Sequence, residues 1–195
     1  LTLAAIKEMT STPDSVYLFS FATSGDDGRS GLRFAWSTDK ENWFEIGRNY
    51  GYLRCDYSRW GSQKKMLDPY LKQSSDGEWI CTWKLNDHDG YGQATSKDLI
   101  NWTSQKYPRT TPDFDGVRVK PIVAGEEQKG NINRVAWTLV DGLDKNYGWN
   151  QYRNSLHGER PVQDGERFAG LKPVKATVTV QPEGAKAISD VLLGA

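Results

Sequence analysis

The sequence lacks several features on which common functions depend. It has two cysteines and two histidines, and 25 Lys and Arg balance 25 Asp and Glu. Cys55 and Cys81 are too few for a disulfide scaffold or a cysteine-based zinc site, and whether they pair is left open. The zero net charge argues against a nucleic-acid partner. Because no apolar run approaches the roughly 18 residues of a membrane-spanning helix, no membrane role is expected either.

Aromatic residues are abundant by contrast, with 8 Trp, 9 Tyr and 6 Phe in 195 residues. They can bury enough surface for a folded core, which argues against disorder. An indole ring also offers a flat apolar face on which the C–H face of a sugar can stack. Burial in the core of an all-β domain is the other interpretation for each tryptophan, and both stay open.

Segments rich in β-branched and aromatic residues dominate the chain and predict an all-β fold. The expected strands cover residues 16–22, 32–37, 78–83, 91–96, 117–123, 133–139 and 174–180. Turn clusters such as Ser24–Gly28 and Asn86–Gly90 separate them. A helix is expected only over residues 185–193.

An internal repeat gives the most information. Residues 37–43, Ser-Thr-Asp-Lys-Glu-Asn-Trp, match residues 96–102, Ser-Lys-Asp-Leu-Ile-Asn-Trp, at a separation of 59 positions. A third, degraded copy is expected to begin at residue 135. A four-stranded antiparallel unit repeated at this period is typical of a β-propeller blade. We expect the Ser and Asp to cap a turn and the Trp to pack between blades, so the motif forms the fold and binds no ligand.

These motifs resemble the five-bladed β-propeller glycosidases, namely glycoside hydrolase family 43 and its relatives. The resemblance covers about residues 15–105 and includes Asp68-Pro69, Asp76-Gly77 and the repeat. It implies a partial propeller with about three recognisable blades, over residues 1–60, 61–112 and, in degenerate form, 113–155. Residues 156–195 would form a short C-terminal strand and helix that either leads into a further domain or is cut from a longer chain. Five blades need about 250–300 residues, so we expect a fragment or part of a longer parent chain.

Two carboxylates are candidates for catalysis. In the family that the motifs resemble, an Asp at the inner end of a blade's first strand faces the central channel, which implies this role for Asp68. Inverting hydrolysis places such a base opposite a protonated carboxyl roughly 6.5–9.5 Å away. Glu127 is the candidate acid, although a solvated loop is the alternative for it. For Asp68 the alternative is a turn that merely begins a strand.

The segment between the two clear repeats predicts a binding surface. Arg54, Tyr57, Arg59 and Trp60 combine planar stacking faces with bidentate donors for hydroxyls and carboxylates. An inter-blade loop fixed by Arg–aromatic stacking is the alternative. Two more residues complete the expected substrate-binding set, Trp83 and His88.

No cofactor and no metal are expected. A structural calcium ion remains open because Asn86–Gly90 is rich in oxygen donors, although this segment lacks the spacing of an EF-hand. The sequence therefore predicts a carbohydrate-active domain, either an arabinosidase- or xylosidase-type hydrolase or part of one. A non-catalytic glycan-binding or domain-packing module is the alternative, and a protein-interaction propeller is a third. The expected partner is an oligosaccharide or plant-type polysaccharide, in a secreted, periplasmic or cell-surface location.

Overall fold

The computed structural model describes residues 14–86, 89–110 and 114–156, with only the helical backbone described over 149–156. The chain divides into two units, one of residues 14–151 and one of residues 1–13 and 152–195. Everything below concerns the first unit. The predicted C-terminal strand and helix, residues 174–180 and 185–193, lie outside the described residues.

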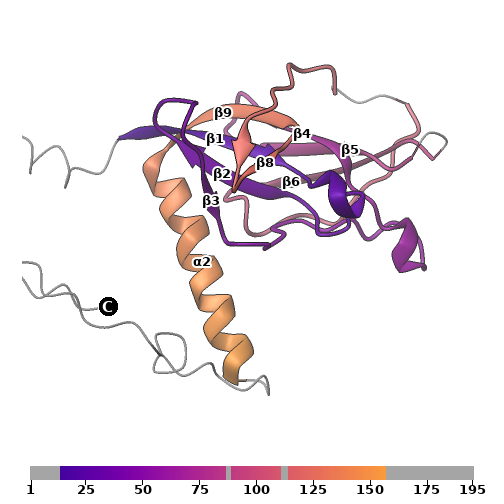
Figure 1. Cartoon of the computed structure of the whole chain (residues 1–195). Helices are drawn as coiled ribbons and strands as arrows, with labels where there is room; N and C mark the ends of the chain where they lie inside the picture. Colours follow the sequence, from indigo (N-terminus) through magenta and orange to yellow (C-terminus); the bar gives the residue numbers. More distant parts are fainter. Residues whose placement is uncertain (1–13, 87–88, 111–113, 157–195) are drawn as a thin grey trace, which may run out of the picture. The chain divides into compact units, whose positions relative to one another are not determined.

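The first sheet is four-stranded and antiparallel (Figure 1). Its strands are β1 (Ser15–Phe21), β2 (Arg33–Ser37), β3 (Phe44–Ile46) and β9 (Gly130–Ala136), in the order β3-β2-β1-β9. Three of these strands follow one another along the chain, whereas β9 comes from more than 80 residues later. The sheet is thus completed by a distant strand, which the expectation of a self-contained first blade over residues 1–60 did not include.

The second sheet contains β4 (Leu67–Gln73), β5 (Trp79–Lys84) and β6 (Tyr91–Ser96) in sequence order, again antiparallel. The chain after β6 pairs with its free edge, since Gln93 and Lys106 exchange two backbone hydrogen bonds of 2.9 Å. This fourth segment stands where β3 stands in the first sheet. The two sheets therefore repeat one four-stranded pattern.

The repeated motif forms the same turn in both sheets. In the first copy, the Ser37 hydroxyl accepts the N–H of Lys40 at 2.9 Å. The carboxylate of Asp39 accepts the backbone N–H and the side-chain amide of Asn42, each at 2.8 Å. Ser96 and Asp98 make the equivalent bonds in the second copy. The predicted capping role of the Ser and Asp is confirmed.

The tryptophan closes each turn. Trp43 Nε1 donates to the carbonyl of Lys40 at 3.0 Å, and Trp102 Nε1 donates to that of Leu99 at 3.1 Å. Both accepting residues have positive φ, 66° for Lys40 and 61° for Leu99. A non-glycine residue adopts this conformation only where the surroundings fix it. The motif therefore specifies a turn, in which the tryptophan, expected to pack between blades, bonds to its own turn.

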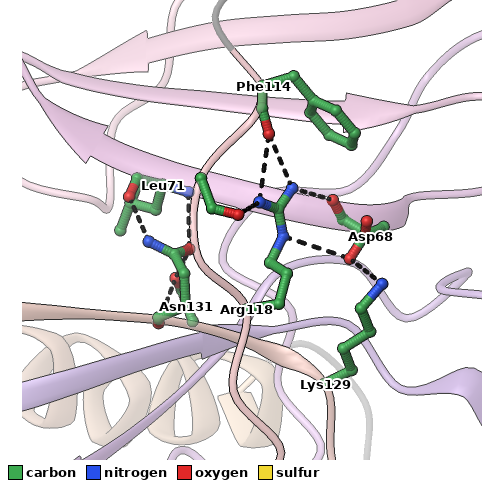
Figure 2. A network of polar contacts seen from close by, with 8 residues as sticks. Asp68, Leu71, Phe114, Arg118, Lys129 and Asn131 are labelled. Carbon is green, nitrogen blue, oxygen red and sulfur yellow. Dashed lines mark hydrogen bonds and ion pairs between the residues drawn. The ribbon is translucent and has the colours of Figure 1, made fainter.

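The two sheets are joined where β9 lies beside β4 (Figure 2). Asn131 is buried there, with 4% of its surface exposed. Its side-chain oxygen accepts the N–H of Leu71 at 2.9 Å, and its amide donates to the Leu71 carbonyl at 2.7 Å. The Ser20 hydroxyl of β1 donates to the same oxygen at 3.0 Å. The Asn131 side-chain amide thus makes the two hydrogen bonds with the Leu71 backbone that a neighbouring strand would otherwise make.

Helix α2 (Trp137–Leu156) corrects the prediction of a degenerate third blade over residues 113–155. Val140 and Leu143 are fully buried and Leu139 packs against the same core. Leu143 follows Val140 by three residues and Leu139 by four, which is the spacing of one helix face. Tyr52 donates from its hydroxyl to the Leu143 carbonyl at 2.9 Å and so ties the helix to the first sheet. Burial raises the pKa of this phenol.

Only the end of the expected strand over residues 117–123 is a strand. There β7 (Ile122–Val123) and β8 (Glu126–Glu127) form a small hairpin. Within the described residues the sheets are antiparallel, a single α-helix follows them, and the sheets do not close into a ring. The all-β expectation holds apart from α2, whereas a propeller remains a proposal. No described helix is long and apolar enough to cross a membrane.

The Asn131 junction can be tested by Asn131→Ala. The change leaves the N–H of Leu71 buried without a partner, and we expect it to lower the free energy of unfolding by about 2–3 kcal/mol. Asn133→Ala is the matched control, because Asn133 only shares the Leu71 carbonyl, at 3.0 Å, and should cost about 1 kcal/mol or less. Urea unfolding measures both. Equal costs would show that the junction does not depend on Asn131.

The negative charge of Asp98, in the second repeat turn, predicts that the free energy of unfolding depends on pH. Burial raises the pKa of Asp98, but the hydrogen bonds from Asn101, Ile100 and Ser96 outweigh it and the net pKa is lowered. A lowered folded pKa contributes stability that is present above about pH 4 and lost as the pH falls through the folded pKa. Asp98→Asn keeps an acceptor but removes the charge. We expect it to cost about 1 kcal/mol or less at neutral pH, given solvent screening.

The cost should be smaller at about pH 3 than at neutral pH, because the unfolded chain then gains a proton at Asp98 and the lowered folded pKa no longer contributes its full stability. Urea unfolding at the two pH values checks it. A cost that stays constant between them would contradict the assignment of the charge to this turn.

Candidate functional site

Asp68 lies at an irregularity in β4. The register of β4 on β5 shifts between Leu67 and Tyr70, and Asp68 has a φ of 48° within that shift. The following residue is Pro69, which normally keeps its predecessor in the extended region. A left-handed residue before proline is strained by about 1–3 kcal/mol, and strain of this kind is often found at functional sites.

Two cations face the Asp68 carboxylate (Figure 2). Arg118 Nε lies 3.3 Å and Lys129 Nζ lies 3.0 Å from its Oδ1 atom. Both contacts are ion pairs by distance, although neither has the angles of a hydrogen bond. The Arg118 side chain is 11% exposed, whereas that of Lys129 is 52% exposed. The buried partner orients Asp68, and the exposed one faces solvent.

Arg118 is itself fixed by its surroundings. It donates to the carbonyls of Phe114, at 3.2 Å, and of Gly116, at 2.8 Å. Its guanidinium lies over two rings, 4.5 Å from the centre of Tyr70 and 4.8 Å from that of Phe114. A Cβ on Gly116 would come 2.0 Å from the Tyr70 ring. The segment after residue 113 therefore fits closely around this one cation.

Asp68 and Lys129 line a pocket of about 170 Å³. A second carboxylate, Asp27, lines it too, and it forms an ion pair with Lys65 at 3.0 Å. The hydrogen bond and charge of Lys65 lower the pKa of Asp27. Sequence reasoning treated this residue as part of a turn. A Cβ on Gly28 would lie 1.9 Å from the Met66 carbonyl, which is how closely that turn approaches the start of β4.

The structure does not bring Glu127 to Asp68. It lies in the β7–β8 hairpin with 60% of its side chain exposed, paired with Lys120 at 3.3 Å. It does not line the pocket described above, which contains Asp68. Its surroundings are those of the solvated loop that the sequence left open as the alternative.

The predicted binding segment forms a loop apart from the pocket. Arg54, Arg59 and Trp60 are exposed, Trp60 to 67%, while Tyr57 is half-buried against Tyr107 at 5.0 Å between ring centres. Gln105 fixes the loop, because its amide donates to the Arg54 carbonyl at 2.6 Å. Among these residues, Trp60 alone presents a large exposed ring.

Trp83 requires a correction. It is fully buried, and a Cβ on Gly92 would come 2.1 Å from its ring, so neither indole face is open to a sugar. His88 lies outside the described residues. Cys55 and Cys81 are both buried and unpaired, and burial raises the pKa of each thiol. No three His, Cys, Asp or Glu of the described part are grouped as a metal site would require.

Comparison with known proteins adds little. No protein-family model matches the chain, and no curated protein matches it. One solved structure with some similarity is a glycosyl hydrolase from Bacteroides ovatus, at 21% identity and a TM-score of 0.32. The match covers 48% of this chain and 28% of that one, so the aligned part is just over a quarter of the hydrolase. A TM-score this low does not establish a shared fold.

The two cations should differ in their contribution to stability. Arg118→Ala removes the donor from the carbonyls of Asp68, Phe114 and Gly116 and takes one of its two cations from the Asp68 carboxylate. We expect it to lower the free energy of unfolding by about 3 kcal/mol. Lys129→Ala removes an exposed partner and should cost less than about 1 kcal/mol. Chemical denaturation compares them. Similar values would show that Arg118 does not hold this site together.

Proposed function

We propose that the chain is a carbohydrate-active domain in which Asp68 is the carboxylate anion of a sugar-binding site. The observation that carries the proposal is the placement of Asp68. Its strained backbone and two cations hold a partly exposed carboxylate at a pocket mouth. A carboxylate accepts hydrogen bonds from sugar hydroxyls and can activate water. The family resemblance of Asp68-Pro69 supports the same role.

Hydrolysis is the leading form of this proposal, of the arabinosidase or xylosidase type. An inverting glycosidase pairs an anionic base with a protonated acid. Asp68, in ion pairs with two cations, fits the base or an electrostatic stabiliser and does not fit the acid. Asp27 does not fit the acid either, because Lys65 lowers its pKa. The acid would then come from outside the described pocket, and we keep Glu127 only as the sequence-based candidate.

A non-catalytic glycan-binding module is the second candidate. It is favoured by the same ion pairs, since both pocket carboxylates already have cationic partners. In that case the site holds an oligosaccharide or plant-type polysaccharide, and Trp60 supplies a separate stacking ring. Either form is consistent with a secreted, periplasmic or cell-surface protein, and the location is part of the proposal.

Asp68→Asn tests both forms, with Asp141→Asn as the matched control, since Asp141 is a partly exposed carboxylate of α2 that does not line the Asp68 pocket. Hydrolysis of aryl arabinosides, xylosides and galactosides is measured beside calorimetric titration with the corresponding sugars. If the chain is a hydrolase, we expect Asp68→Asn to lower the turnover number by at least about 100-fold, the range of an acid–base group. Asp141→Asn should leave it unchanged.

Saturable sugar binding without turnover, weakened by Asp68→Asn and not by Asp141→Asn, would support the binding module. Thermal unfolding of each variant excludes loss of folding as the cause. If the parent chain shows neither turnover nor binding, the carbohydrate role is refuted. Turnover or binding that survives Asp68→Asn would refute the assignment of Asp68.

A further inference from the structure

A second pocket, of about 200 Å³, lies where α2 packs against the first sheet. Its walls include the indoles of Trp36, on β2, and Trp137, at the start of α2. The two ring centres are 4.9 Å apart and their planes are 74° apart, so the rings form a corner. This volume is below the roughly 300 Å³ of an ordinary drug-sized site, so it suits a small ligand.

The same pocket has an excess of negative charge. Three carboxylates line it, those of Glu45, Asp141 and Asp144. Glu45 forms an ion pair with Arg33, and Asp141 is paired with Lys145 at 2.6 Å. Within the part of the chain that the structure describes, no cation pairs with Asp144. One negative charge therefore remains uncompensated at an aromatic pocket.

We propose that this pocket binds a small organic cation, a quaternary or protonated ammonium group. A cation over an aromatic ring is attracted by the negative face of the ring, most strongly by Trp. An uncompensated carboxylate at the rim adds a charge of the opposite sign without a competing side chain. Trp36 and Trp137 would contact the methyl or methylene groups, and Asp144 would face the positive charge.

A sugar is the obvious rival, because indoles and carboxylates also bind pyranoses. The charge decides between them. A sugar hydroxyl could donate a hydrogen bond to Asp144, but only a cation would also compensate its charge, because the net charge of the pocket is negative. The site lies apart from Asp68 and does not depend on the carbohydrate proposal, so the two can fail independently.

The test titrates the full chain with choline at constant ionic strength and follows binding by calorimetry and by the indole N–H resonances. The neutral isostere 3,3-dimethylbutan-1-ol, with carbon in place of nitrogen, separates charge from shape, and xylose represents the sugar. We expect saturable choline binding and at least threefold weaker binding of the isostere. Asp144→Asn should weaken choline binding about threefold and leave binding of the isostere unchanged.

Trp137→Leu should weaken choline binding about tenfold. Glu41→Gln is the control, an exposed carboxylate of the first repeat turn outside the pocket, and should change nothing. Because Asp144 is exposed, its variant tests the proposal even if Trp137→Leu does not fold. No choline binding, equal binding of the isostere, preferential binding of xylose, or unchanged binding by Asp144→Asn would each overturn the proposal.

Discussion

The pair of hydrogen bonds between the Asn131 side chain and the Leu71 backbone fixes where β9 lies along β4. Asp68 precedes Leu71 by three residues and Lys129 precedes Asn131 by two, so the same register brings the carboxylate and the ammonium to 3.0 Å. A buried amide with both polar groups satisfied allows little sliding, because a shift would leave the Leu71 N–H unpaired. The candidate site therefore depends on a contact between sheets.

The sequence could predict what is encoded locally. The two repeat turns are specified within seven residues, because Ser, Asp and Asn bond to nearby backbone groups. It could predict a strand near residue 133 but not that this strand completes the first sheet beside β1, since strand pairing over that distance leaves no local signal. Helix α2 was misread because Trp137 and Tyr147 favour strands by propensity, while the buried positions Val140 and Leu143 follow helical spacing.

The site was predictable only in part, for the same reason. Asp68 could be singled out by the proline after it, and its unusual backbone agrees with that choice. Its partners come from 50 and 61 positions further along the chain, and nothing in the local pattern of Arg118 or Lys129 pointed to them. The burial of the tryptophans was the hardest feature to predict, because the same residue type is fully buried at Trp83 and mostly exposed at Trp60.

The backbone strain at Asp68 and the burial of Arg118 both cost free energy, and these costs bear on the role of the arrangement. An ordinary turn before a strand could place Gly or Asn at a φ of 48° with less strain, and it would need no buried guanidinium. Here a left-handed aspartate precedes proline, and Arg118 is withdrawn from water to meet it. Such a buried pair adds little net stability over an apolar replacement. The arrangement is better explained by what it holds, a carboxylate with a fixed orientation in the lining of a pocket.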